Sequence, residues 1–270
     1  ENGSVDGTPK QDHAYDVAYE GDLAYLADGG NGLTVYDLTK DPSDLQSGFL
    51  VSNLGGSAQG KAELGRSTGI ALWYHPTLPK RYAFLAAGPR GVGVVDVSDP
   101  AAPELVKVFE PIKIEDGKVG HADGRAVDVQ VAGALAYFTY DSFGIVCYEV
   151  ADLIEALPPD VDPTKIWKVQ GGVVLFDYRP EAVGRFKLQT VPGYADVDGG
   201  ALNFIQRQDA GGLLFHVAYG TAGVATILWT EPGMPLLLDL LDTPGEAASV
   251  EEADGRLFVA DSAGGLVYFE

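Results

Sequence analysis

The stretch AYFTYDSFGIVCYEV (residues 136–150) decides the fold, because its pattern returns four more times along the chain. The other copies are AYLADGGNGLTVYDL (24–38), AFLAAGPRGVGVVDV (83–97), FHVAYGTAGVATILW (215–229) and LFVADSAGGLVYFE (257–270). In every copy a strand-like run leads into turn residues, and a glycine eight positions after the first quoted residue opens a second alternating run. This is the pattern of a β-hairpin with a glycine at positive φ beside its return strand. Repetition of one supersecondary unit predicts a repeat fold.

Each hairpin is preceded by a further strand-like run, and proline-marked turns lead to another strand downstream, most clearly in residues 97–109 and 231–241. The upstream runs carry an apolar residue at the same aligned position, namely Val17, Ile70, Val129, Phe204 and Val250. Four antiparallel strands per repeat are typical of a β-propeller blade. We therefore expect an all-β protein in which residues 1–270 form a single β-propeller domain of about five four-stranded blades, with six blades as the alternative.

The spacing between the repeats is uneven, and the longest interval lies between Gly144 and Gly223. It predicts an insertion over residues 151–190, within an elaborated third blade, that opens with a helical turn stopped by Pro158. Residues 1–13 carry little apolar alternation and are expected to form a loose N-terminal segment. The last copy ends on its third strand, so either that blade has three strands, the N-terminus completes it, or the natural polypeptide continues.

Composition limits the function classes. The chain has 18 basic and 39 acidic residues and a net charge of −21, which disfavours nucleic acid as a partner. No apolar run reaches the length that membrane insertion by a helix needs. Cys147 is the only cysteine, so an intrachain disulfide is excluded. The start at Glu1 without methionine suggests a processed, exported chain or a fragment.

The run GVGVVDVSDPAAPELV (residues 91–106), with echoes at residues 32–45 and 172–186, resembles the LVIVD-repeat proteins. These are bacterial and archaeal surface or secreted chains, and the resemblance covers nearly the whole sequence. It implies a β-propeller located outside the cytoplasm, and it implies no established reaction. The fourth and fifth copies depart from the motif, with Ile227 where its aspartate would stand.

Candidate binding residues lie on the innermost strands, which line the channel of a propeller. The third aligned position of these strands holds Asp16, Gly69, Asp128, Asn203 and Ser249, and three residues earlier stand His13, Arg66, Arg125, Gly200 and Glu246. We expect Asp16, Asp128, Asn203, Ser249, His13, Arg66 and Arg125 to bind a cation, water or a small polar ligand. The alternative is structural, since an inner-strand aspartate also accepts hydrogen bonds from the neighbouring blade.

Catalytic and metal patterns are weak. The four histidines are widely spaced, no GxSxG elbow is present, and Cys147 lies mid-strand. The sequence predicts no cofactor and leaves calcium open. A channel hydrolase or lyase using Asp16 and Asp128 on a small polar or sugar-like substrate is the second hypothesis.

The first hypothesis is a non-enzymatic exported or cell-surface protein that acts as an interaction or scaffold subunit of a larger extracellular assembly. Its partner would be another protein, with a surface redox protein or a filament as candidates. The insertion at 151–190 and the loop at 48–66 are the expected contact surfaces, because binding residues concentrate on such variable segments.

Overall fold

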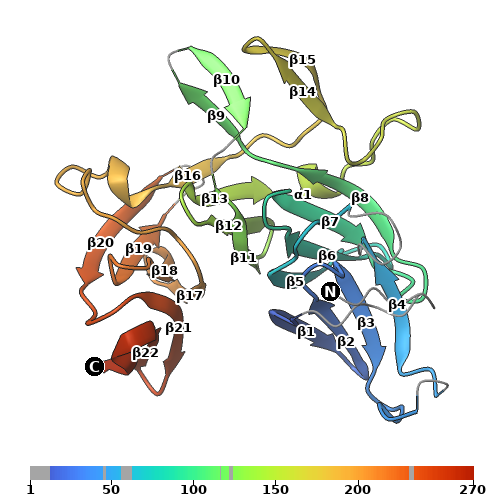
Figure 1. The fold of residues 1–270 in the computed structure, drawn as a ribbon, viewed down its shortest axis with the longest axis horizontal. Coiled ribbons are helices and arrows are strands. Elements are labelled where there is room, and N and C mark those ends of the chain that lie inside the picture. Colours follow the sequence, from blue (N-terminus) through green and yellow to red (C-terminus); the bar gives the residue numbers. More distant parts are fainter. Residues whose placement is uncertain (1–12, 45–46, 56–62, 116, 122–123, 231–233) are drawn as a thin grey trace. The chain divides into compact units, whose positions relative to one another are not determined.

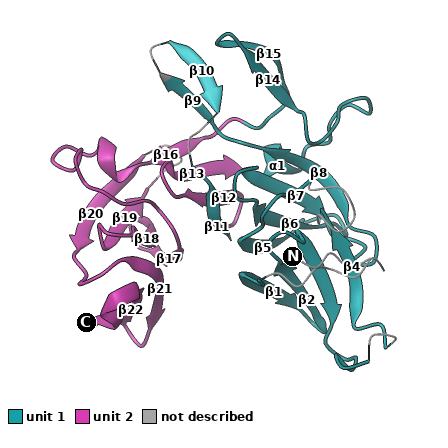
Figure 2. Cartoon of the chain, viewed as in Figure 1, with its two compact units in different colours: residues 1–131, 150–180 teal, residues 132–149, 181–270 magenta. Residues whose placement is uncertain are grey.

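A computed structural model describes residues 13–44, 47–55, 63–115, 117–121, 124–230 and 234–270. The chain divides into two compact units (Figure 2): residues 1–131 with 150–180, and residues 132–149 with 181–270. Each unit is described by itself. The prediction of one domain over residues 1–270 stays a prediction, and the loose segment at 1–13 lies outside the described residues except for His13.

The first unit holds two four-stranded antiparallel sheets whose strands neighbour one another in chain order (Figure 1). One comprises β1 (Asp16–Glu20), β2 (Leu23–Ala27), β3 (Leu33–Asp37) and β4 (Leu50–Leu54). The other comprises β5 (Gly69–Tyr74), β6 (Arg81–Ala86), β7 (Val92–Asp96) and β8 (Glu104–Phe109). Strand β11 (Ala126–Ala132) then carries the chain into the second unit.

Two further hairpins and a short helix complete the first unit. They are β9 (Ile112–Glu115) with β10 (Lys118–His121), helix α1 (Val150–Ile154), and β14 (Trp167–Gln170) with β15 (Val173–Asp177). Each hairpin forms a two-stranded sheet of its own. The helical turn predicted at the start of the insertion is therefore present as α1.

The second unit contains three sheets in chain order. The first is a four-stranded sheet that β11 begins and that continues with β12 (Leu135–Tyr140), β13 (Gly144–Glu149) and β16 (Gly184–Phe186). The second is four-stranded and holds β17 (Phe204–Asp209), β18 (Gly212–Ala218), β19 (Val224–Trp229) and β20 (Pro235–Leu241). The third holds β21 (Ala247–Ala253), β22 (Arg256–Asp261) and β23 (Gly265–Phe269). Two 3₁₀ turns, η2 (Leu188–Thr190) and η3 (Ser262–Gly264), also belong to it. Among the described residues the last sheet has three strands, as one of the sequence alternatives allowed.

All five predicted hairpins are confirmed, as β2–β3, β6–β7, β12–β13, β18–β19 and β22–β23. Their glycines have φ values from 75° to 92°, the region where a β-carbon is disfavoured. Strand β16 explains the end of the insertion, because residues 184–186 return to the sheet and pair with β13. Residues 173–177 pair with β14 in a separate two-stranded sheet, so among the described residues they add no strand to the sheets of the repeats.

The cores lie between consecutive sheets. Tyr25, Leu33, Leu64 and Leu85 form one buried cluster in the first unit. Tyr137, Cys147, Phe204 and Phe215 belong to a second cluster, and Val250 and Val259 to a third. Of the five aligned apolar positions only Val17 is exposed, while Ile70, Val129, Phe204 and Val250 are buried. The fold therefore buries sheet faces against sheet faces in chain order.

A repeated backbone joint links neighbouring sheets. The turn glycines Gly29, Gly88 and Gly220 form isolated antiparallel bridges with Ser67, Ala126 and Ala247, which lie at or just before the start of the next inner strand. In the last of these, Gly220 N donates to Ala247 O at 3.1 Å and Ala247 N to Gly220 O at 2.9 Å. Each joint satisfies backbone groups that would otherwise be unpaired where one sheet gives way to the next.

Candidate functional site

Asp16, the first predicted channel residue, holds two backbone amides. Its Oδ1 accepts a hydrogen bond from Val17 N at 2.8 Å. Its Oδ2 accepts from Ile70 N at 2.9 Å, so the carboxylate of β1 reaches across to β5 of the next sheet. This contact is the one expected of the structural alternative, in which an inner-strand aspartate joins two blades.

Asp128 of β11 packs against Gly69 of the same strand β5. It is buried, and its Oδ1 accepts from Val129 N at 2.7 Å. A β-carbon placed on Gly69 would lie 2.7 Å from the Asp128 Cα, so the packing of β11 against β5 requires glycine there. Gly69, which interrupts the polar ring in the sequence, therefore has a packing reason. Asp16 and Asp128 thus contact the successive residues Ile70 and Gly69.

Asn203 and Ser249 meet in the second unit. Asn203 Oδ1 accepts from Ser249 Oγ and from Val250 N, both at 3.0 Å. Asn203 therefore repeats the Asp16 contact, because each binds the amide of the apolar residue at the fourth aligned position of the next inner strand. These two residues belong to a different unit from Asp16 and Asp128, so a shared ring stays a prediction.

The predicted cationic residues are exposed. The Arg66 guanidinium carbon lies 4.8 Å from the centre of the Tyr15 ring, and the His13 and Tyr15 rings lie 6.1 Å apart. The structure thus brings His13 and Arg66 to the same tyrosine. Arg125 is also exposed, immediately before β11. A role of these three residues in ligand binding remains a prediction.

No group of three or more His, Cys, Asp or Glu side chains is arranged to hold a metal ion within the described ranges. Cys147 is fully buried on β13 beside Tyr137. Burial raises the pKa of the Cys147 thiol to about 12, so the nucleophilic thiolate is suppressed near neutral pH. The hydrolase or lyase hypothesis rests on Asp16 and Asp128 alone, and both carboxylates are engaged with backbone amides.

Exposed apolar side chains gather in the first unit on the hairpins β9–β10 and β14–β15, which project side by side (Figure 1). We define the hairpin surface as Ile114, Val173, Leu175 and Phe176, four large apolar side chains that are all exposed. Val173 and Leu175 are 61% and 54% exposed, and a β-bulge at Leu175 interrupts the pairing of β15 with β14.

The base of these hairpins is firmly held. The Trp167 ring is buried against the His121 ring, with centroids 4.3 Å apart, and the Arg179 guanidinium lies 5.0 Å from its centre. His121 Nδ1 contacts Glu110 Oε2 at 2.9 Å. Burial raises the pKa of the Glu110 carboxyl, and His121 opposes that shift. These contacts fix the base of the hairpins and so hold the hairpin surface in a defined position.

The sequence predicted part of this surface. The insertion at 151–190 contains β14–β15, whose signal is the apolar run Val173–Phe176. Hairpin β9–β10 was missed, although the alternation of residues 112–115 and the Asp116-Gly117 pair are an ordinary hairpin signal. The loop at 48–66 lies partly outside the described residues, which exclude 56–62.

Comparison with known proteins assigns the fold. The LVIVD repeat model matches residues 12–53 and 80–110, which include β1–β4 and β6–β8. No curated protein matches the sequence. Among solved structures, the chain is similar to the WD40 β-propeller domain of Doa1, with a TM-score of 0.51 and 12% identity over 96% of this chain and 64% of that one.

Two further similar structures have bacterial origins. One is the extracellular domain of a hybrid two-component system from B. thetaiotaomicron, with a TM-score of 0.50 and 8% identity over 100% of this chain and 28% of that one. The other is BamB from Moraxella catarrhalis, with a TM-score of 0.44 and 12% identity over 93% of this chain and 67% of that one. The repeated four-stranded sheets, the two matched segments and the WD40 likeness agree, and the chain has a β-propeller fold with two segments that match the LVIVD repeat.

Proposed function

We propose that this protein is a non-enzymatic interaction subunit that docks another protein through the hairpin surface. The observation that carries the proposal is the exposure of Val173 and Leu175 on β15, a strand that, among the described residues, pairs only with β14. A two-stranded hairpin is marginal in water, and exposed apolar side chains gathered on one element mark interaction sites. Anchoring through Trp167 keeps these side chains presented for a partner.

The charge of the chain indicates the kind of partner. A net charge of −21 attracts basic proteins and speeds their encounter, while the apolar hairpin surface supplies the short-range contact. The expected partner is therefore a protein with an apolar patch surrounded by lysine or arginine. Within the described residues no helix is long and apolar enough to cross a membrane.

The location that fits this proposal is outside the cytoplasm. The LVIVD resemblance implies a surface or secreted protein, and we propose that the chain is exported and serves in a cell-surface assembly, with a surface redox protein or a filament as the candidate partner. Fractionation of the producing cells, with the chain followed by an antibody, tests the location separately from docking.

The docking test compares the double variant V173D/L175D with L78D. Leu78 is as exposed as Leu175, at 54%, and lies in the turn between β5 and β6, away from the hairpin surface. The partner is identified by affinity purification with the intact wild-type chain, and its binding is then measured with purified proteins. We expect V173D/L175D to weaken binding about 30-fold or more, because truncating a buried contact residue costs about 2 kcal/mol or more.

L78D should bind like the wild type, and all three proteins should unfold at nearly the same temperature because the substituted side chains are exposed. Equal binding by V173D/L175D and L78D contradicts the proposal. A wild-type chain that recovers no protein above background from its own cells contradicts it as well.

A further inference from the structure

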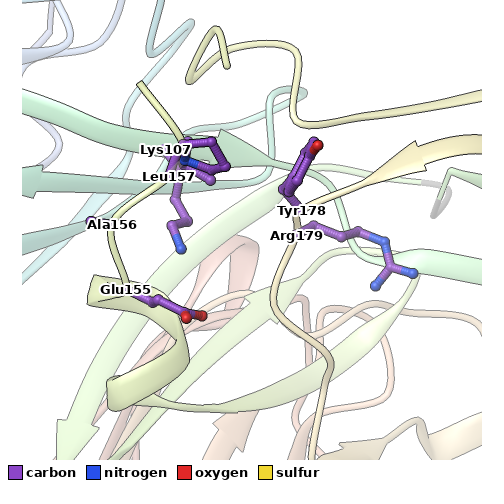
Figure 3. Close-up of a pocket in the computed structure, with 7 residues that line it drawn as sticks. Lys107, Glu155, Ala156, Leu157, Tyr178 and Arg179 are labelled. Atoms are coloured by element: carbon purple, nitrogen blue, oxygen red, sulfur yellow. The ribbon is translucent and has the colours of Figure 1, made fainter. Parts of the chain in front are cut away.

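A pocket of about 530 Å³ lies in the first unit, beside the hairpins' base and separate from the hairpin surface. Its lining includes Lys107 of β8, Glu155 and Leu157 after α1, and Tyr178 and Arg179 after β15 (Figure 3). Three chain segments that are far apart in sequence therefore meet around one cavity. A volume of this size accommodates a small organic molecule.

Lys107 is the unusual residue of this pocket. It is only 2% exposed, and its Nζ donates to the backbone carbonyl of Asp152 at 2.9 Å. An ammonium group has three donors, and this carbonyl is the only acceptor of Lys107 Nζ among the described residues. Burial lowers the Lys107 pKa, while Glu155 and Asp152 act in the opposite direction. A buried ammonium with donors to spare is costly unless an acceptor reaches it.

Arg179 brings a second buried cation to the same lining. Its side chain is 6% exposed; Nη2 pairs with Asp177 at 3.0 Å, and the buried Nε has no acceptor among the described residues. Figure 3 shows the guanidinium extending away from Lys107. Both cations of the pocket thus have donors without acceptors, which is the deficit that an anionic ligand corrects.

Glu155 restricts the ligand further. Figure 3 shows its carboxylate on the same side of the pocket as the Lys107 ammonium. Glu155 is exposed and repels a dianion such as phosphate more strongly than a monoanion. It also offers an acceptor to a hydroxyl or ammonium group that lies next to the ligand's anionic end.

We propose that this pocket binds a small 2-hydroxy or 2-amino carboxylic acid, whose carboxylate accepts from Lys107 and whose hydroxyl or ammonium donates to Glu155. The side chain of such an acid would lie against Leu157 and Tyr178. This site is independent of the docking surface, because none of its lining residues belongs to the hairpin surface.

Calorimetric titration of the intact chain tests the proposal with lactate, alanine, lactamide, propionate and phosphate as probes. We expect lactate and alanine to bind, and lactamide and phosphate to bind at least about tenfold more weakly, because the charge-assisted bond to Lys107 is lost or opposed. Propionate should bind more weakly than lactate, and E155Q should reduce that difference.

The variant K107M keeps the length of the side chain and removes the charge, and it should lose lactate binding. K165M is the matched control, since Lys165 is an exposed lysine of the same unit outside the pocket, with 75% of its side chain exposed. Acetylation of the wild type, followed residue by residue by mass spectrometry, gives a readout that needs no variant: lactate should slow acetylation of Lys107 and leave that of Lys165 unchanged.

The proposal is overturned if neither lactate nor alanine binds at about 10 mM, a concentration well above the Kd of a specific site. It is also overturned if K107M binds lactate as the wild type does, or if lactate leaves the acetylation of Lys107 unchanged. Equal affinity for lactate and propionate overturns the role given to Glu155.

Discussion

Gly144 shows why a glycine returns in every repeat. Its φ of 92° disfavours any side chain, and a β-carbon there would lie 2.0 Å from the carbonyl oxygen of Phe186 on β16. Gly32 and Gly223 meet the carbonyls of Leu54 and Leu241, the last residues of β4 and β20, in the same way. Gly265 has a φ of 76° but nothing within 4 Å, because the described part of the last sheet has no fourth strand. The recurring glycine therefore serves both the turn and the close approach of a fourth strand.

Gly144 and Gly265 form a matched pair of substitution sites within the second unit. We expect Gly144→Ala to lower the free energy of unfolding by about 3 kcal/mol or more, because φ strain and a backbone clash add. Gly265→Ala should cost about 1 kcal/mol, since only the φ strain applies. Urea denaturation followed by tryptophan fluorescence measures both values. Equal losses at the two positions would show that the fourth strand contributes nothing to the requirement for glycine.

At the scale of elements, side-chain and backbone hydrogen bonds join consecutive sheets. Asn203 on the segment before β17 binds the amide of Val250 on β21, as Asp16 binds that of Ile70. These side chains, together with the bridges of the turn glycines, hold each sheet against the inner strand of the next. A polar residue at this aligned position is therefore explained by a structural role whether or not a ligand also binds there.

Asn203→Ala tests that role. Removal of the amide leaves the buried Val250 N–H without this acceptor, and we expect a loss of about 1–3 kcal/mol in the free energy of unfolding. Ser249→Ala is the control, because it removes a bond to the same oxygen and leaves the Val250 contact in place, so its loss should stay below about 1 kcal/mol. An Asn203→Ala protein as stable as the wild type would argue for a ligand-binding role instead.

At the scale of the whole molecule, the protein combines a strongly acidic surface with apolar cores that hold weak acids in neutral form. Cys147, Tyr137 and Tyr219 lie in one core cluster. Burial raises the pKa of Cys147 and of Tyr219 to about 12, and it raises the pKa of Tyr137 still further. The folded chain therefore keeps protons that the unfolded chain releases near pH 9 for the thiol and near pH 10 for the phenols.

The consequence is a loss of stability in alkaline solution. Above about pH 9 the unfolded state binds fewer protons than the folded state, so the free energy of unfolding falls as the pH rises. Below that pH the full stabilisation is present. Denaturation at about pH 7.5 and about pH 10.5 measures the difference, and Tyr137→Phe should reduce it because one of the coupled acids is removed. A free energy of unfolding that stays constant between these two pH values would contradict the burial of these groups.

The sequence by itself determined the repeat and its hairpins, because turn glycines and alternating apolar residues are local signals that every copy carries. It also located the inserted segment and the helical turn that begins it. It could not show that residues 173–177 pair with β14, since pairing partners depend on which strands are already occupied.

Only the tertiary structure decided the environment of individual polar groups. Asp16 and Asn203 became acceptors for Ile70 and Val250 because consecutive sheets pack inner strand against inner strand, a contact that spans about fifty residues of chain. Lys107 reads in the sequence as an ordinary strand lysine. It is buried at a pocket because α1 and the segment after β15 pack around the end of β8, and no local pattern encodes that meeting of distant segments.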